Sequence, residues 1–360
     1  MGVLPRQHEN GANMRKPAKD RLSVLIAAYK NVMLVRRCLD SLLSVFGGTL
    51  PETVLVDDAA GDPDMRALAD EYVKFGLKFV VMPKNGGFAG ANNFGYPLCT
   101  KEYVVLVNSD VMFREDSLSP LVAFLDSHPK AGIVQGTLVI KNGESGVDGS
   151  LNGCGAFLTW AGVNTPLGWL APVESPIRLD ARRCFAAYGA MFMIRRGVVE
   201  SMGGLLFHDF FHTYYEEVNL CHRAWLAGWE VWYAPTPIAE HVHCATTGKY
   251  CLRKTILKKF YRNIRFSYLT CFGWRGLLTV YPIFEILALG QAILPLFKLR
   301  AMHFCAHAWA WWNLLKMAKT ILRTRRRIQS SRKICDKDLF KIIMRPYPLK
   351  EFLNAVRGSF

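Results

Sequence analysis

The chain has no pair of cysteines at the Cys-x-x-Cys spacing, although ten of its 360 residues are cysteine. That absence argues against a zinc ribbon, a redox dithiol and a disulfide framework, and it suits a reducing compartment. The first 20 residues also lack the apolar run that a secretory signal needs. Arg6 stands where myristoylation at Gly2 requires Ser or Thr, so we do not expect that lipid.

Acidic residues are scarce in the last third of the chain. Residues 251–360 hold 22 of the 45 Lys and Arg but only 4 of the 29 Asp and Glu. The formal net charge of +16 therefore belongs to this region, which we expect to meet an anionic partner. A hydrophobic content of 51% excludes a disordered chain, and the length allows one large α/β domain with an appendage.

Short apolar runs alternate with helical patterns over the first 130 residues. This alternation predicts parallel strands joined by right-handed crossovers. Residues 131–183 are rich in Gly, Pro and short strands and predict a variable, loop-rich half. A helix at about Tyr214–Ala227 and a strand at Glu230–Ala234 follow. The earlier buried strands are expected at Leu22–Ala28, Thr53–Val56, Lys78–Met82 and Tyr103–Val107.

Asn108-Ser109-Asp110 stands at the end of the fourth expected strand. A β-branched run that stops at a carboxylate points that group out of the carboxyl edge of a sheet, where open α/β folds bind ligands. An Asp beside an Asn makes an oxygen site suited to Mg²⁺ or Mn²⁺ that carries a diphosphate. Taken alone, the triplet is also compatible with a turn or a helix cap.

Two further segments follow strands on the same predicted edge. A carboxylate of Asp57-Asp58 can accept a hydrogen bond from a pyrimidine ring N–H, although an Asx turn explains the pair equally well. The Gly- and Asn-rich segment Asn85–Gly95 opens a helix, where glycines let the backbone approach a ligand and the helix N-terminus favours anions. Its glycine spacing excludes the dinucleotide fingerprint, and a plain tight turn is the alternative.

Glu217 and His241 are the remaining candidates for chemistry. Thr213 and Glu216 have capping-box spacing, which predicts a structural role for Glu216. Glu217 is then free to face a pocket and deprotonate an acceptor hydroxyl, unless it is a solvated surface acid. His241 and His243 are placed to act as paired ligands, and His241 alone completing a metal shell with Asp110 is as compatible with the spacing.

The region after residue 265 differs in kind. Gly276–Phe297 has Glu285 as its only charge, and Ala301–Leu315 is rich in Trp. A 22-residue helix would be about 33 Å long, enough to cross a bilayer. The central Glu285 and the kink expected at Pro282 favour a helix that lies in the interface. We expect an anionic membrane surface as its partner, and a buried helical hairpin over the catalytic domain is the alternative.

Taken in order, these motifs resemble those of the family-2 glycosyltransferases, and most of all the rhamnosyltransferase-like branch. The resemblance covers about residues 22–265. It departs from the family at Lys30, at Glu216-Glu217 in place of a Glu-Asp pair, and at Asn219. The segments that carry it are Ser23–Tyr29, Val56–Ala59, Asn85–Asn93, Leu106–Asp110, Tyr215–Arg223, Ala227–Trp229, His241 and Tyr261–Asn263.

The resemblance implies an α/β fold of the GT-A type, a Rossmann-like mixed sheet, and inverting, metal-dependent transfer from a nucleotide-diphosphate sugar. Glu217 is implied as the base, with Glu216 beside it, and Asp110 and His241 as contacts of Mg²⁺ or Mn²⁺. The residues expected to bind the nucleotide sugar are Ala28, Tyr29, Asp57, Asp58, Asn85, Gly87, Asn93, Asn108 and Asp110.

Together these features predict an enzyme on the cytoplasmic face of the cell membrane, peripheral or with one or two embedded helices. It would move rhamnose from dTDP-rhamnose, or another sugar from a UDP-sugar, to a saccharide or lipid-linked acceptor in surface polysaccharide or glycolipid synthesis. The expected parts are a disordered polar N-terminus (1–20), a GT-A domain (21–265), membrane-associated helices (266–328) and a basic tail (329–360).

Two alternatives belong to other classes. A nucleic-acid-binding protein would use the basic tail, but Trp-rich apolar runs interrupt its charges, so we expect no nucleic acid partner. A sugar nucleotidyltransferase would show a Gly-rich triphosphate loop after the first strand, where this chain has Tyr29-Lys30-Asn31-Val32.

Overall fold

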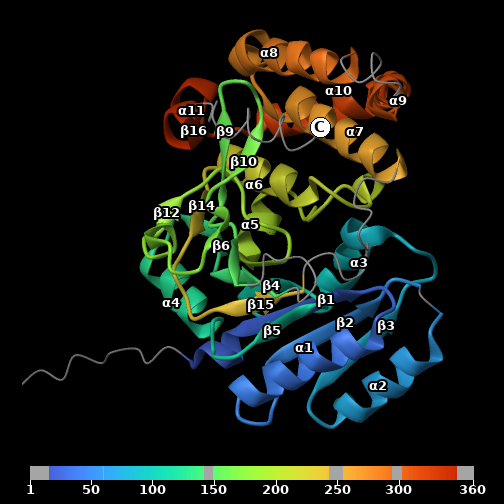
Figure 1. The fold of residues 1–360 in the computed structure, drawn as a ribbon, viewed down its shortest axis with the longest axis vertical. Helices are drawn as coiled ribbons and strands as arrows, with labels where there is room; N and C mark the ends of the chain where they lie inside the picture. Colours follow the sequence, from blue (N-terminus) through green and yellow to red (C-terminus); the bar gives the residue numbers. More distant parts are fainter. Residues whose placement is uncertain (1–15, 60, 142–148, 243–253, 294–301, 347–360) are drawn as a thin grey trace, which may run out of the picture.

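The computed structural model describes residues 16–59, 61–141, 149–242, 254–293 and 302–346, so His243 and the two ends of the chain lie outside it. Its centre is an eight-stranded sheet with the order β12-β14-β6-β13-β4-β1-β2-β3 (Figure 1). In that order the strands are β12 (Arg182–Arg183), β14 (Glu230–Tyr233), β6 (Ala131–Gln135), β13 (Met191–Arg195), β4 (Tyr103–Asn108), β1 (Leu22–Ala28), β2 (Glu52–Asp57) and β3 (Leu77–Val81).

The first four strands in the sequence, β1 to β4, are parallel, as the alternating pattern predicted. β1 lies between β2 and β4, and β3 pairs with β2. β13 is antiparallel to both β4 and β6, so the sheet is mixed. The start of β13 therefore lies at the same edge as the carboxyl ends of β1, β2 and β4.

Both faces of the central strands are buried, which explains their nearly continuous apolar sequences. Successive strand residues point to opposite faces. Val24 and Ile26 pack in the core beneath α1 (Val32–Val45), α2 (Pro63–Val73) and α4 (Ser119–Ser127). Leu25 packs in the opposite core with α3 (Gly87–Gly95), α5 (Arg196–Ser201) and α6 (Glu216–Leu226).

Strands from the segment predicted to be rich in loops join strands from elsewhere in the chain in two small sheets. One has the order β11 (Trp169–Pro172), β8 (Ser150–Asn152), β7 (Leu138–Ile140), β15 (Ala239–His241) and β5 (Val111–Phe113). The other has the order β10 (Asn164–Pro166), β9 (Ala156–Thr159) and β16 (Met344–Arg345). In the first, β15 runs antiparallel to β5 and sets His241 opposite Val111.

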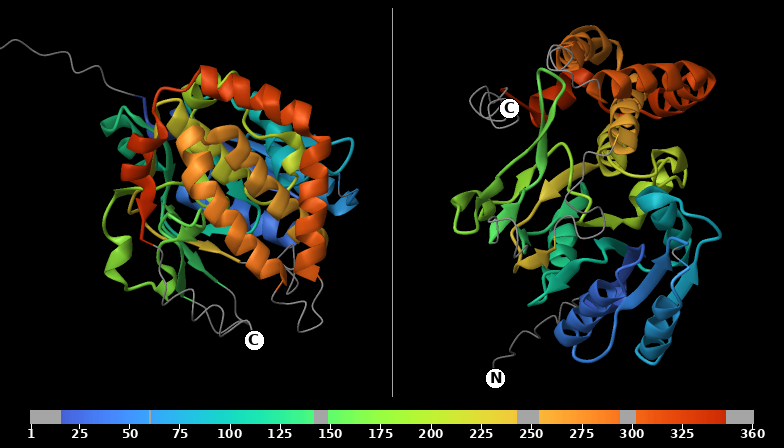
Figure 2. Two further views of the ribbon diagram at one scale, coloured as in Figure 1. Left: turned by 90° about the horizontal axis from the view of Figure 1, so that it is seen from above. Right: turned by 45° about the vertical axis from the view of Figure 1, so that its right-hand side comes forward.

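The last helices form a cap at the end of the molecule opposite α1 and α2 (Figures 1 and 2). We use "cap" for residues 254–293 and 302–346. It comprises α7 (Lys254–Cys271), α8 (Trp274–Ile293), α9 (Met302–Lys316), α10 (Ala318–Ser330) and α11 (Asp336–Ile343). Phe266, Phe284 and Phe340 of the cap belong to the same buried cluster as Leu25 of the sheet. The inner side of the cap is therefore continuous with the core of the body.

Glu285, the lone charge of the long apolar segment, is paired with Arg265, and Arg265 connects three cap helices. The Arg265 side chain of α7 is 1% exposed and donates to Glu285 Oε2 of α8 from Nε at 3.2 Å and from Nη2 at 2.9 Å. Nη2 also lies 3.0 Å from Nδ1 of His307 in α9. Among the described residues, no helix has both the length and the apolar character needed to cross a bilayer.

We predict that Arg265→Ala lowers the free energy of unfolding by about 3–5 kcal/mol, because it leaves Glu285 without its buried partner. Urea denaturation followed by circular dichroism measures the change. Arg275→Ala is the matched control, since Arg275 is exposed on the same helix as Glu285 and should cost no more than about 0.5 kcal/mol. Equal losses of unfolding free energy in the two variants would show that the Arg265–Glu285 pair does not stabilise the cap.

Candidate active site

Asp110 and His241 meet at the carboxyl edge of the sheet. Asp110 follows β4 after one turn, and its carbonyl accepts a hydrogen bond from Val242 N at 2.9 Å. One oxygen of its carboxylate lies 3.3 Å from His241 Nε2, and both side chains are buried. The pairing of β15 with β5 produces this contact between residues that are far apart in sequence.

This pair of side chains fits a divalent ion that arrives with an anionic ligand. A carboxylate oxygen and an imidazole nitrogen are acceptable donors for Mn²⁺ and, with more oxygens, for Mg²⁺. Within the described ranges, no group of three or more His, Cys, Asp or Glu side chains is arranged to hold a metal. A diphosphate or water would therefore have to supply the other donors.

Asp57 and Asp58 have different surroundings at the end of β2. The carboxylate of Asp58 accepts hydrogen bonds from Gly86 N at 2.6 Å, Gly87 N at 2.9 Å and Asn85 Nδ2 at 2.9 Å. Burial raises the pKa of Asp58 even though the two glycine N–H groups act in the opposite direction. Asp58 thus closes the glycine-rich turn. The contact with a nucleotide base expected of Asp58 and of Asp57, also buried, stays a prediction.

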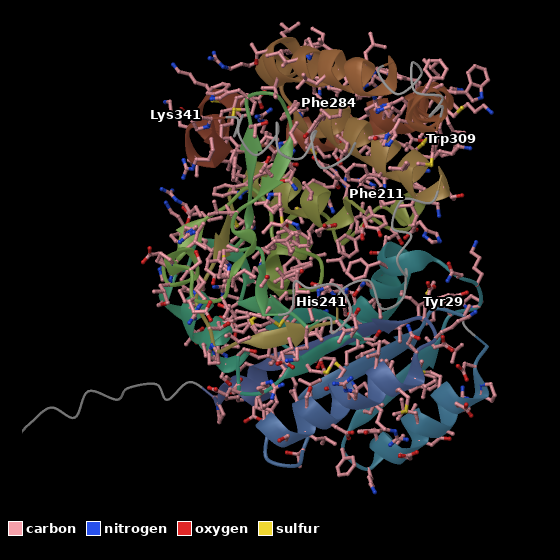
Figure 3. The ribbon with its side chains drawn as sticks, viewed as in Figure 1. Tyr29, Phe211, His241, Phe284, Trp309 and Lys341 are labelled. Carbon is pink, nitrogen blue, oxygen red and sulfur yellow. The ribbon has the colours of Figure 1, made fainter. Side chains whose placement is uncertain are left out.

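Ala28 and Tyr29 lie at the same edge, where β1 ends. The carbonyl of Ala28 accepts from Asp58 N at 2.8 Å. Tyr29 is 38% exposed, and Nζ of Lys30 lies 5.4 Å from the centre of its ring. Tyr29 and His241 both border the region between the sheet and the segment that contains Phe211 (Figure 3).

The glycine-rich turn is fastened to the segment that precedes α6. Gly87 has φ +66°, and a Cβ at this position would overlap the ring and carbonyl of His212. The carbonyl of His212 accepts from Ala89 N at 3.0 Å, and its Nε2 lies 3.0 Å from Asn85 Oδ1. Sequence reasoning missed His212, because no motif connects it with a turn more than a hundred residues earlier.

Asn93 makes a second connection of this kind. Its Nδ2 donates to Phe207 O at 2.9 Å, and its Oδ1 accepts from Phe207 N at 3.0 Å. Asn85 and Asn93 therefore hold protein segments together in this structure. The contact with a nucleotide sugar expected of each, and of Gly87, stays a prediction.

The segment before α6 has strained backbone. His212, Tyr214 and Tyr215 have φ values of 63°, 71° and 75°, in the left-handed region that non-glycine residues rarely adopt. Asn263 of α7, fully buried, holds this segment: its Nδ2 donates to the carbonyls of Tyr214 at 2.8 Å and Phe211 at 3.1 Å. Positions of this kind persist only where surrounding contacts fix them.

The prediction of a capping box at the start of α6 is wrong, because the backbone before this helix is left-handed. α6 begins at Glu216, its N-cap residue is Tyr215, and no side chain caps it. The hydroxyl of Thr213 lies instead 3.2 Å from Nδ1 of His212. The left-handed residues between Thr213 and the helix turn the chain, so tertiary contacts replace the local cap.

Glu216 and Glu217 differ in exposure although they are adjacent. Glu216 is 5% exposed, whereas Glu217 is only partly buried. Burial raises the pKa of Glu216 well above its ordinary value, and the neighbouring charge of Glu217 raises it further. Burial also raises the pKa of Glu217, to about 7. Both carboxyl groups are therefore harder to ionise than an exposed glutamate, and Glu217 can exchange a proton near neutrality.

The carboxyl group of Glu217 faces the sheet edge across Gly189. Its Cδ lies 3.5 Å from the point where a Cβ on Gly189 would stand. The next residue, Ala190, accepts from Asn108 N at 2.9 Å, so this part of the chain is bonded to the end of β4. The structure thus gathers the carboxyl group of Glu217, with its raised pKa, and the Asp110–His241 pair at one edge.

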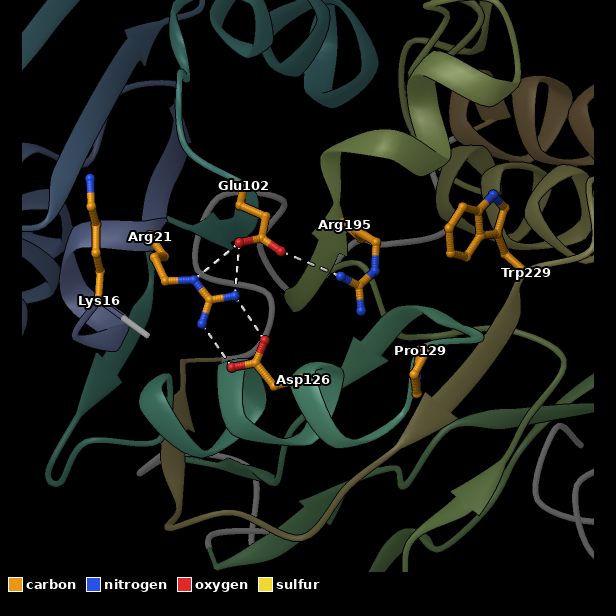
Figure 4. Close-up of a pocket in the computed structure, with 7 residues that line it drawn as sticks. All are labelled: Lys16, Arg21, Glu102, Asp126, Pro129, Arg195 and Trp229. Atoms are coloured by element: carbon orange, nitrogen blue, oxygen red, sulfur yellow. Dashed lines mark hydrogen bonds and ion pairs between the residues drawn. The ribbon is translucent and has the colours of Figure 1, made fainter. Parts of the chain in front are cut away.

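A hollow of about 590 Å³ lies at the opposite edge of the sheet (Figure 4). Arg21, Glu102 and Asp126 line it, and Arg21 forms ion pairs of 2.7 Å with both acids. Arg21 precedes β1 and Glu102 precedes β4, so the hollow is at the amino ends of these strands. The ion pairs of Arg21 in this hollow connect parts of the fold. The carboxyl edge is therefore the candidate active site.

Comparison with known proteins finds glycosyltransferases among the relatives of this chain. An uncharacterized glycosyltransferase of Haemophilus influenzae is 31% identical over 121 residues, 33% of this chain and 45% of the relative. The poly-beta-1,6-N-acetyl-D-glucosamine synthase of Staphylococcus epidermidis strain RP62A is 29% identical over 126 residues, 34% of this chain and 30% of the relative. This chain thus matches less than half the length of either.

A solved structure of GalNAc-T7 with UDP, GalNAc and Mn²⁺ superposes with a TM-score of 0.52 at 17% identity, covering 69% of this chain and 50% of that one. That likeness shows the fold, a mixed α/β GT-A fold. The model of the family described as "Glycosyl transferase family 2" matches residues 23–203, half of the chain. This span includes β1, β2, the glycine-rich turn and Asp110, and the chain belongs to the family-2 glycosyltransferases.

Proposed function

We propose that this protein transfers a sugar from a nucleotide-diphosphate donor to a hydroxyl group of a saccharide or lipid-linked acceptor, with inversion at the anomeric carbon. The observation that supports it is the position of Glu217, which faces the edge that carries Asp110 and His241. A base on one side and a diphosphate site on the other are the two parts that a single displacement needs.

In this reaction the Glu217 carboxylate takes the proton of the acceptor hydroxyl as the oxygen attacks the anomeric carbon. Attack opposite the leaving diphosphate breaks the sugar–oxygen bond and inverts the centre. Asp110 and His241 would hold Mg²⁺ or Mn²⁺, which when bound neutralises charge on the diphosphate. Unlike a glycosidase, this enzyme needs no second carboxyl group as acid. The raised pKa of Glu216 disfavours a second negative charge beside this base.

The proposed donor carries a pyrimidine base. The buried Asp57 at the end of β2 offers a carboxylate to the ring N–H that uracil and thymine share. dTDP-rhamnose, predicted from the sequence, and UDP-sugars both meet that requirement. The name of the Staphylococcus epidermidis relative contains N-acetyl-D-glucosamine, so UDP-N-acetylglucosamine belongs among the donors to test.

The proposed site of action is the cytoplasmic face of the cell membrane, in the synthesis of a surface polysaccharide or glycolipid. The excess of basic residues after residue 250 supports this placement. A lipid-linked acceptor would be presented at such a surface.

We predict that the full-length protein with Mg²⁺ or Mn²⁺ releases nucleotide diphosphate from a UDP- or dTDP-sugar and that GDP-mannose is a poor donor. Asp110→Ala should abolish turnover and weaken binding of UDP or dTDP measured by calorimetry with the metal present. Asp70→Ala, at an exposed acid of α2, is the control and should be neutral. Turnover that is unaffected by a chelator, or equal in both variants, would contradict the metal-dependent mechanism.

Glu217→Gln is predicted to lower kcat by about 10²–10⁴, the usual contribution of a positioned base, with donor affinity unchanged. Glu216→Gln is the matched control. Because burial raises the pKa of Glu216 well above its ordinary value and so favours the neutral acid, a neutral amide of the same size should cost little stability and less than about tenfold in kcat. Equal kinetic loss in the two variants would show that their roles cannot be separated in this way.

The pH profile tests the protonation state of the base. Because the pKa of Glu217 is raised to about 7, kcat/KM should increase with pH through neutrality and level off above it. Below that pH the carboxyl group is protonated, so the rate should decrease by about tenfold per pH unit. The residual activity of Glu217→Gln should not show this increase with pH. A wild-type profile that is flat between pH 5 and 8 would contradict the assignment of Glu217 as the base.

A further inference from the structure

We propose that the outer side of the cap docks on an anionic lipid bilayer, with α8 lying in the plane of the interface. We define the outer cap surface by Leu278, Ile286 and Leu289 of α8, Trp312 and Leu315 of α9, and the basic side chains of α10. The surface deepens the proposed function by naming how the enzyme reaches a lipid-linked acceptor.

The two sides of α8 are both apolar, but only one is covered. Val280, Phe284 and Ala288, spaced by four residues, are buried against the body, and Phe284 points inward in Figure 3. On the other side Leu278 is 72% exposed and Ile286 69%. A helix that is apolar all round is normally buried on all sides, in a protein or in lipid. A continuous exposed apolar patch marks an interaction site.

The neighbouring helix also exposes apolar side chains, among them an aromatic residue suited to the headgroup region. α9 packs beside α8 at the outer end of the molecule, as both views of Figure 2 show. Trp312 is 59% exposed and Leu315 66%. Trp is enriched at membrane–water boundaries because its ring is apolar and its N–H is polar.

The structure separates basic residues that hold the fold from those free to meet a partner. Arg325 donates to the carbonyls of Leu269 and Phe272, and Arg327 to those of Met202 and Gly203. Lys319, Arg323 and Arg326 are exposed on α10, and no ion pair engages them within the described ranges. Their charge suits the negative potential of a leaflet that contains anionic lipid.

Charge and apolar exposure together favour a bilayer over other occupants. Glu285 is the only acidic residue of α7–α10, and it is paired with Arg265. A second copy would therefore bring two cationic surfaces together. Nucleic acid would match the charge but leave Leu278 and Ile286 in water. An anionic bilayer satisfies both groups at once, and stable anchoring requires two such signals.

Vesicle binding by the full-length protein tests the proposal, with phosphatidylglycerol–phosphatidylcholine vesicles compared with phosphatidylcholine alone. We expect binding to the anionic vesicles that weakens as NaCl is raised. Replacing Lys319, Arg323 and Arg326 by Gln should weaken it about 100-fold, at about fivefold for each charge. Ile286→Ser with Leu289→Ser should weaken it by at least about tenfold.

Matched controls remove the same groups from the body of the protein. Gln in place of Arg66, Lys74 and Lys130 removes three exposed charges, and Val73→Ser with Leu179→Ser removes two exposed apolar side chains. Neither should change vesicle binding. Thermal denaturation checks that each variant is folded, and the salt dependence of the wild type tests the charge contribution without any substitution.

Three results would overturn the proposal. The first is no binding of the wild type to anionic vesicles at low salt. The second is an equal effect of cap variants and control variants. The third is self-association or nucleic acid binding that the cap variants abolish while vesicle binding is absent. Because the readout is lipid binding, its failure would leave nucleotide release and transfer to a soluble acceptor untouched.

Discussion

The hydrogen bonds of Asn263 hold the segment on which the geometry of the active site depends. This buried amide donates to the carbonyls of Phe211 and Tyr214, beside three residues with left-handed backbone. Each such residue costs about 1–3 kcal/mol, so the segment needs an external support to keep this conformation. The support comes from the first cap helix, so the placement of Glu217 depends on a helix that follows it in sequence.

The same segment connects the donor side with the acceptor side of the edge. His212 contacts the glycine-rich turn at Gly87 and Asn85, and that turn is closed by Asp58 at the end of β2. Residues that hold the turn to the segment before α6 are thus adjacent to residues proposed to bind the nucleotide. This arrangement explains why several Asn and Gly residues of the turn have structural partners, and it would fix the proposed base relative to the proposed diphosphate site.

The two sides of the cap differ in a way that its composition alone could not show. Its inner side shares a core with the sheet, and buried Arg265 pairs with Glu285 inside it. Its outer side exposes apolar and basic side chains. The buried hairpin expected from the C-terminal sequence describes the inner side, and the membrane-facing role of the outer side stays a proposal. If the outer side of the cap binds a bilayer as proposed, the domain on its inner side is held beside that surface.

The sequence by itself determined the parallel strands, their carboxyl-edge acids and the family, because strand periodicity and the residues next to strand ends are local properties. It also indicated Glu217 and the pairing of Asp110 with His241, although their roles stay predictions. Only the tertiary structure decided that Asp58 closes a turn, that α6 starts without Thr213 as its cap, and that Glu285 is paired. Each of these depends on a partner distant in sequence, such as His212, Asn263 or Arg265, and no local pattern encodes that contact.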